Sequence, residues 1–392
     1  MKQRIGLLGK IVFAVTICIL LSYFSCQQKQ QELPIGDWIE HGFSAEKRDA
    51  LCTFFQKSTK KMEIPGGALL IIHQDEVILK EAFGIYDLET GRPFPTDEVC
   101  LIASVSKSIS STLMVILEER GFFSLDDPVE KWIPAFKNIK IREGAKPDQP
   151  PLLRQTLSHR SGLPGNADLE EGDPLIRGSL SKVAESLATY GLLAEPGTRY
   201  AYSEAGYKTA GRVAEVATGK SFEVLLKEYL LDPLGMTHTT FHPVIEDINK
   251  WPRAYQREEG ELKPLSAEFI ENALKSGIDP GGSLFSTLDD MGRFLLFHLN
   301  RGKVKGKQLV SAEALDQMLN SPEGQAGPPY GLGLALGSRG PGQARHLGGS
   351  GTFIWFDFEK DLTGFLLTQT RWRGNRAFQQ KFMQIIKTTF EE

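Results

Sequence analysis

The sequence predicts an α+β fold in which one antiparallel sheet is built from both ends of the chain, is flanked by helices, and carries a mostly helical inserted subdomain. Residues 66–87, GGALLIIHQDEVILKEAFGIYD, read as two strands around a turn at His73–Glu76. Further strand-like stretches run from Tyr330 to Trp372. Between about residues 122 and 325 the pattern is mostly helical and is broken by Pro- and Gly-rich loops. We expect the two sets of strands to share one sheet.

Three helices are expected around this sheet. Residues 43–62 alternate charged and apolar positions at helical spacing, with Ser44 as the N-cap. A capping box at Ser286–Asp289 predicts the start of a second helix, which ends near Asn300. The last helix carries its apolar residues on one side, namely Phe378, Phe382, Ile385, Ile386 and Phe390.

The bulk composition is that of a globular protein without a nucleic-acid partner. The chain has 392 residues, of which 41% are hydrophobic and 24% charged, and its net charge is -4. No cysteine or histidine spacing indicates a metal site, and no motif indicates a cofactor. Outside the N-terminal export segment, Cys52 and Cys100 are the two cysteines, and the sequence permits either a disulfide or two free thiols.

The N-terminus is typical of an export signal. Three basic residues precede an apolar stretch at residues 11–24, which is short for a membrane span. We interpret residues 1–25 as a signal segment, Cys26 as a lipidated cysteine, residues 26–40 as a polar tether and residues 41–392 as the folded domain. This predicts a membrane-anchored lipoprotein of a bacterial cell envelope, with plain secretion or an uncleaved anchor as the alternatives.

The stretch VCLIASVSKSISSTLMVILEERG contains a serine and a lysine with catalytic spacing. The pattern S-x-x-K occurs four times in the chain, and a serine that caps a helix is its commonest explanation. Only Ser104 follows an apolar strand-like run and begins a helix with an apolar side. One helical turn places Lys107 on the face of Ser104, and a desolvated lysine has a lowered pKa and accepts a proton.

Two later phrases complete a known series of motifs. Residues 202–204 read Tyr-Ser-Glu, and residues 346–348 read His-Leu-Gly. After S-x-x-K, they resemble the second and third motifs of the serine β-lactamase and penicillin-binding superfamily, especially the class C β-lactamase-like group of carboxypeptidases, D-amino-acid peptidases and esterases. Further phrases of this group are LLRQTLSHRSGLPG, LLDPLGMTHTTF, GGSLFSTLDDMGRF and YGLGLAL, so the resemblance covers roughly residues 60–390.

The resemblance implies a β-lactamase/transpeptidase-like fold and a set of catalytic residues. Ser104 is then the nucleophile, Lys107 its activating partner, and Tyr202 the phenol that passes the proton to the leaving group. A nearby ammonium makes such a phenol easier to ionise. His159, in LSHRSGLP, is expected to be a structural histidine of its loop.

The resemblance also implies a substrate-binding strand and an oxyanion hole. The backbone N–H groups of Ser104 and Gly349 would bind the oxyanion, beside His346 and Gly348. Where the family usually has asparagine, this chain has Glu204, which only accepts hydrogen bonds and is expected to pair with Lys107 and raise its pKa. Where the family usually has lysine, His346 is largely neutral and holds a substrate carboxylate less firmly, unless a nearby arginine such as Arg345, Arg371 or Arg373 compensates.

These features predict an exported serine hydrolase that forms an acyl-enzyme on an ester, an amide or a D-amino-acid peptide. The expected partners are a small-molecule or peptide substrate, for which the cell wall is one source, and the membrane, through the lipid anchor. Two alternatives remain at this stage: a β-lactamase of the class C type, and a catalytically weak binding or scaffold lipoprotein on the same fold. The oligomeric state is not indicated.

Overall fold

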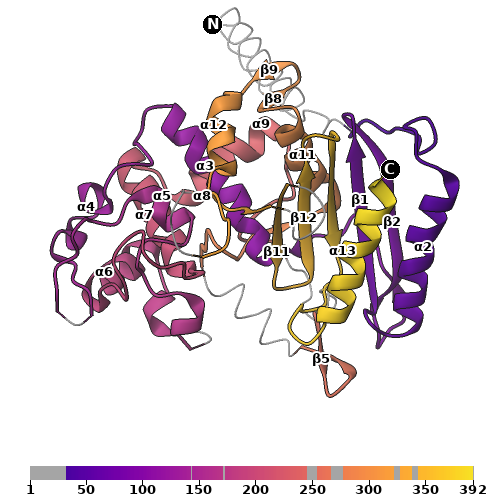
Figure 1. Ribbon diagram of the computed structural model, residues 1–392, viewed down its shortest axis with the longest axis horizontal. Helices are drawn as coiled ribbons and strands as arrows, with labels where there is room; N and C mark the ends of the chain where they lie inside the picture. Colours follow the sequence, from indigo (N-terminus) through magenta and orange to yellow (C-terminus); the bar gives the residue numbers. More distant parts are fainter. Residues whose placement is uncertain are drawn as a thin grey trace, which may run out of the picture. The chain divides into compact units, whose positions relative to one another are not determined.

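A seven-stranded antiparallel sheet lies at the centre of the part of the chain that the structure describes (Figure 1). The computed structural model describes residues 32–142, 144–170, 173–244, 254–265, 277–321, 327–337 and 343–391. Its strands, in spatial order, are β10 (Ala335–Leu336), β11 (Ala344–Gly348), β12 (Thr352–Asp357), β13 (Leu362–Leu367), β1 (Gly66–His73), β2 (Glu76–Asp87) and β3 (Arg92–Pro93). The signal segment and Cys26 lie outside the described residues.

Strands from the N-terminal and C-terminal parts of the chain pair where β1 lies beside β13, as the sequence predicts. β1 pairs with β2 on one side and with β13 on the other, with Leu69 opposite Leu366. The phrase YGLGLAL yields only the two-residue strand β10, because Gly333 has a φ of 72° and the amide of Gly331 bonds to the carbonyl of Leu334 in a turn. The strand β11 then carries the third motif.

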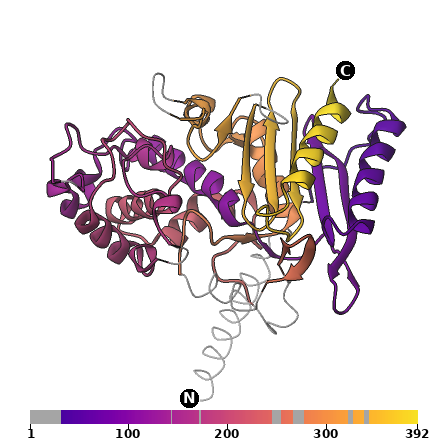
Figure 2. The ribbon, with the colours of Figure 1, turned by 60° about the horizontal axis from the view of Figure 1, so that its bottom comes forward.

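Helices cover both faces of the sheet. β1 is buried on both sides, since Leu69 and Ile71 belong to one core cluster and Leu70 and Ile72 to the other. The first cluster lies under α2 (Ala45–Lys60) and α13 (Arg376–Phe390), which run side by side in Figures 1 and 2. The second cluster lies under α3 (Ser106–Glu119) and α11 (Leu288–Leu299).

A mostly helical subdomain follows α3. Its main helices are α4 (Val129–Trp132), α5 (Leu153–Leu157), α6 (Leu180–Tyr190), α7 (Glu204–Thr218), α8 (Phe222–Leu226) and α9 (Asp232–Leu234), with single turns η2 (Pro134–Asn138), η3 (Asn166–Asp168), η4 (Pro174–Ile176) and η5 (Lys227–Leu231). It is followed by the ribbons β5 (Tyr255–Glu258) with β6 (Glu261–Pro264) and β8 (Lys303–Val304) with β9 (Lys307–Gln308), and by α12 (Ala312–Asp316) with η7 (Gln317–Leu319). Because α3 packs between this subdomain and the sheet, nearly all of its residues are buried.

Two helix starts test the predicted caps. Ser44 caps α2, and its hydroxyl accepts a hydrogen bond from the amide of Lys47, as expected. The predicted capping box at Ser286 is wrong by one residue, because Thr287 is the N-cap of α11 and accepts from the amide of Asp290. Ser286 instead ends the strand β7 (Phe285–Ser286).

Cys52 is half-buried, Cys100 is buried, and both are free thiols. Leu33 and Trp38, within the stretch interpreted as tether, are buried against the domain. None of the helices among the described residues has the length and apolar character needed to span a bilayer.

Candidate active site

The chain reaches Ser104 through a segment that is held from two sides. The two-residue strand β4 (Cys100–Leu101) pairs with β7, and the amide of Ile102 donates to the carbonyl of Leu284 at 3.0 Å. At the start of β12, Thr352 Oγ1 donates to the carbonyl of Ile102 at 2.8 Å, and in the β11–β12 turn Ser350 Oγ donates to that of Leu101 at 2.7 Å. The segment that precedes the serine is therefore fixed to the sheet.

Ser104 lies in a single turn of 3-10 helix, η1 (Ala103–Val105), directly before α3. Ala103 has a φ of 46°, a left-handed conformation that is uncommon for a residue with a Cβ. Ser106 Oγ donates to the carbonyl of Ala103 at 2.6 Å and helps to hold this turn. The Ser104 side chain thus lies at the N-terminus of a long buried helix, where backbone N–H groups and the helix dipole favour negative charge.

Lys107 lies one turn further, as the spacing predicts, and its side chain is fully buried. Its Nζ lies 3.5 Å from Ser104 Oγ and donates to the carbonyl of Gly281 at 2.6 Å. It also lies 4.7 Å from the ring centroid of Tyr202 and 5.3 Å from that of Tyr207. The structure therefore brings the serine, the lysine and the motif tyrosine together.

The pKa of Lys107 is raised, and not lowered as burial alone would make it. Burial is the largest single influence and lowers this pKa, but the charges of Tyr202, Glu204 and Asp279 together outweigh it. These neighbours therefore favour the ammonium form of Lys107. Burial alone would favour a neutral lysine that takes the serine proton, but these neighbours compensate for the loss of water, in the direction expected from Glu204.

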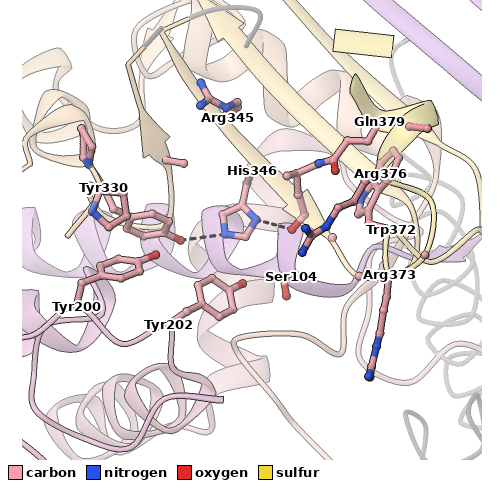
Figure 3. Close-up of a pocket in the computed structure, with 18 residues that line it drawn as sticks. Ser104, Tyr200, Tyr202, Tyr330, Arg345, His346, Trp372, Arg373, Arg376 and Gln379 are labelled. Atoms are coloured by element: carbon pink, nitrogen blue, oxygen red, sulfur yellow. Dashed lines mark hydrogen bonds between the residues drawn. The ribbon is translucent and has the colours of Figure 1, made fainter. Parts of the chain in front are cut away.

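Tyr202 lies in the loop before α7, and Figure 3 shows its hydroxyl pointing toward Ser104. The amide of Asn166 donates to the Tyr202 carbonyl at 2.7 Å, and the ring of His159 packs against the tyrosine ring at 4.4 Å between centroids. His159 Nδ1 accepts a hydrogen bond from the amide of Ser203 at 3.0 Å. This contact gives His159 the structural role that the sequence predicts.

The third motif places His346 on β11 between two hydrogen bonds (Figure 3). Its Nδ1 donates to the carbonyl of Leu347 at 2.9 Å, and its Nε2 accepts from the hydroxyl of Tyr330 at 2.9 Å. Burial and the charge of Lys107 lower the pKa of His346 to about 3, although the Leu347 carbonyl opposes them. His346 is therefore a neutral ring with a fixed tautomer. Tyr330 is a site residue that the sequence analysis missed, although it begins the phrase YGLGLAL.

The two glycines of the third motif differ in their surroundings. A Cβ on Gly348 would lie 1.9 Å from Thr352 Oγ1 and 2.4 Å from the carbonyl oxygen of Ile102, whereas one on Gly349 would meet nothing within 4 Å. Within the described chain, neither the amide of Gly349 nor that of Ser104 donates a hydrogen bond to another residue. Both residues line the same pocket, so the geometry suits an oxyanion hole.

Glu204 does not form the contact expected of it. Its Oε1 accepts from Asn166 Nδ2 at 2.9 Å, and its amide donates to Asn166 Oδ1 at 2.8 Å. Both residues are described, and no ion pair within 4 Å joins Glu204 to Lys107. The carboxylate nevertheless raises the pKa of Lys107 through its charge. The expected direction of that pKa change is confirmed, while the direct pairing is wrong because Asn166 holds the carboxylate.

The pocket in front of Ser104 has a volume of about 910 Å³. Its lining is rich in aromatic rings, which come from Tyr200, Tyr202, Tyr330 and Trp372. Three arginines also line it, Arg345, Arg373 and Arg376, and Arg345 donates to the carbonyl of Gly337 at 2.7 Å. Arg371, considered as a carboxylate partner in the sequence analysis, is not among the lining residues. The site combines an apolar wall with positive charge.

Comparison with known proteins places the chain in a family. The family model described as Beta-lactamase matches residues 54–386. The chain belongs to the beta-lactamase family. It is 30% identical over 278 residues to penicillin-binding protein 4 of Amycolatopsis lactamdurans, covering 70% of this chain and 68% of that protein. It is 26% identical over 360 residues to esterase EstB of Burkholderia gladioli, covering 82% of this chain and 90% of that protein.

Comparison with a solved structure shows the same fold. EstCE1, described as a hydrolase with promiscuous acyltransferase activity, superposes with a TM-score of 0.75 at 21% identity, covering 87% of this chain and 98% of that one. The β-lactamase/transpeptidase-like fold predicted from the motifs is confirmed. As a member of this family the chain is a serine hydrolase.

Proposed function

We propose that this chain is an esterase-like serine hydrolase that cleaves small carboxylic esters or related amides through an acyl-enzyme on Ser104. The observation that carries the proposal is the grouping of Ser104, Lys107 and Tyr202 at an aromatic pocket, next to the amides of Ser104 and Gly349, which donate no hydrogen bond within the described residues. Nucleophile, proton carrier and oxyanion donors are the parts that acyl transfer requires.

In the proposed reaction, Tyr202 enters as the phenolate, and Ser104 Oγ attacks the substrate carbonyl carbon while its proton passes to the Tyr202 oxygen. Lys107, charged at neutral pH, stabilises the phenolate form of Tyr202 and stays protonated throughout. The oxyanion accepts hydrogen bonds from the amides of Ser104 and Gly349. Collapse of the intermediate breaks the bond to the leaving group, which takes the proton from Tyr202. Water then hydrolyses the acyl-enzyme by the same route in reverse.

The surroundings of His346 favour a substrate whose group next to this ring is uncharged. At the motif position itself, β11 presents a neutral imidazole held by Tyr330 and Leu347 in place of an ammonium, while Arg345 on the same strand also lines the pocket. A carboxylate of a β-lactam would gain no charge-assisted hydrogen bond from it. The aromatic wall favours an apolar acyl or alcohol group instead. The resemblance in sequence to esterase EstB over most of both chains supports the same choice.

A substrate panel tests the proposal. p-Nitrophenyl esters of increasing chain length, D-alanyl peptides and nitrocefin are offered to the wild type and to Ser104→Ala. We expect ester turnover that exceeds nitrocefin turnover and that falls at least ~10³-fold in Ser104→Ala. Faster turnover of nitrocefin than of every ester would reverse the ranking in favour of a β-lactamase. No turnover of any substrate would favour the scaffold alternative.

We further propose that the enzyme is exported and tethered to a membrane through Cys26. Support comes from the order of basic residues, apolar stretch and cysteine at the N-terminus. A substrate from the cell envelope would then be within reach of the active site.

A further inference from the structure

A second lysine is buried close to the site without any part in the chemistry described so far. Lys208 lies on α7 and is 2% exposed, and its Nζ forms an ion pair with Asp279 Oδ2 at 3.0 Å. Asp279 is itself 8% exposed. The attraction between two buried charges often does no more than offset the cost of removing them from water, so a pair of apolar residues would often be no less stable. Stability alone therefore does not account for this pair.

Asp279 connects this pair to the catalytic lysine through a tight turn at residues 279–283. Its Oδ1 accepts from the amide of Gly281 at 2.8 Å, and its own amide donates to Ser283 Oγ at 3.0 Å. The carbonyl of Gly281 in turn accepts from Lys107 Nζ at 2.6 Å. The Asp279 carboxylate thus binds Lys208 through Oδ2 and the amide of Gly281 through Oδ1. The carbonyl of Gly281 in turn binds Lys107.

The turn at residues 279–283 is closely packed against α3 and α7. A Cβ on Gly281 would lie 3.2 Å from both Lys107 Nζ and Asp279 Oδ1. A Cβ on Gly211 of α7 would lie 2.8 Å from Pro280. Ser110 Oγ of α3 donates to the carbonyl of Pro280 at 2.6 Å. The helices that carry Lys107 and Lys208 are therefore both fastened to this one turn.

Several other titratable groups face Lys107 from the elements packed around it. They are Tyr202 in the loop before α7, Glu204 at the start of α7, Tyr207 within α7, His159 after α5, His346 on β11 and Asp279 in the turn. The pKa values of His159 and His346 are lowered by burial and by the charge of Lys107, so both rings are neutral. Asp279 and Glu204 are then the carboxylates that stabilise the ammonium.

We propose that Lys208 is a positioning residue that shares the charge of Asp279 and thereby limits how strongly this carboxylate holds Lys107 in its protonated form. With Lys208 present, Asp279 keeps the Gly281 carbonyl in place while part of its charge is neutralised. Without Lys208, its full charge would act on Lys107. Without the Asp279 charge, two buried ammonium groups would oppose each other and Lys107 would lose its proton more readily. The part of this inference that concerns catalysis rests on the proposed function.

A double-mutant cycle tests the inference by direct titration. The protein is labelled with ¹³C at the ε-carbon of lysine, and the Lys107 resonance is assigned by its loss in Lys107→Met. Lys208→Met should raise the titration midpoint of Lys107 by about one pH unit, a tenfold change in the proton equilibrium. Asp279→Asn, which keeps the Oδ1 acceptor for Gly281, should lower it by at least about one unit. The double variant should return it to within about 0.3 units of the wild type.

Control variants distinguish an effect of charge on Lys107 from an effect on the fold or on turnover. Lys220→Met breaks the exposed Lys220–Glu228 pair, 2.5 Å long, and should leave the Lys107 midpoint unchanged. Shifts of the two single variants in the same direction, or a double variant that does not return toward the wild type, overturn the inference. If Lys208→Met does not fold, the comparison of Asp279→Asn with the double variant decides alone. The NMR midpoint does not depend on turnover, so failure of the proposed function would appear only in the rates. Where turnover is present, its alkaline limb should move with the midpoint.

Discussion

At the scale of single residues, Glu204 shows how one substitution in a motif alters the chemistry around a buried lysine. An amide at this position would be neutral, whereas the carboxylate raises the pKa of Lys107 from a place beside Asn166. The motif tyrosine then works next to a fixed ammonium. The sequence predicted this direction but not the partner, because Asn166 lies in a different loop and nothing in its own surroundings marks it.

Glu204→Gln removes the charge and keeps an oxygen that can accept from Asn166 Nδ2. The pKa of Lys107 should fall, and the alkaline limb of the rate profile should move to lower pH by up to about one unit, since a partly exposed carboxylate is screened by water. The profile of kcat/KM against pH measures this. Glu185→Gln, a change to an exposed carboxylate on α6, serves as the control. An alkaline limb that moves equally in both variants, or in neither, would show that Glu204 does not act on Lys107.

At the scale of elements, the β11–β12 turn controls the site by holding the segment before Ser104. Gly348→Ala would drive a Cβ into Thr352 Oγ1 and the Ile102 carbonyl, whereas Gly349→Ala has free space. We expect Gly348→Ala to lower the free energy of unfolding by about 1–3 kcal/mol and to reduce turnover. Gly349→Ala should leave the stability within about 0.5 kcal/mol of the wild type. Urea unfolding measures both, and equal stability of the two variants would contradict the predicted clamp.

The elements also show where sequence reasoning succeeds and where it stops. The hairpin β1–β2, the cap at Ser44 and the final helix follow from local periodicity and capping, so they could be predicted. Thr287, and not Ser286, caps α11, because Ser286 in β7 pairs with β4, which is distant in sequence. Asp279, Lys208 and Tyr330 were missed for the same reason, since their roles depend on contacts between distant segments.

At the scale of the whole molecule, the function of the enzyme domain and the export of the chain through its N-terminal segment are tested separately. The domain belongs to the beta-lactamase family along most of its length, while the export segment lies outside the described residues. If Cys26 is lipidated, the protein should be recovered with membranes and should incorporate labelled palmitate. Cys26→Ser should abolish incorporation and release the protein or block its processing. A soluble mature protein that begins at another residue would contradict the lipoprotein proposal.

The central claim is that Ser104 becomes covalently acylated, and intact-mass spectrometry of the enzyme after rapid quenching tests it most directly. The wild type is mixed with a p-nitrophenyl ester or a fluorophosphonate, and the adduct is located by peptide mapping. The proposed reaction predicts one added acyl or phosphonyl group on Ser104, and none in Ser104→Ala, whose fold is verified by circular dichroism. An adduct that persists in Ser104→Ala, or that maps to another residue of the wild type, would contradict the claim.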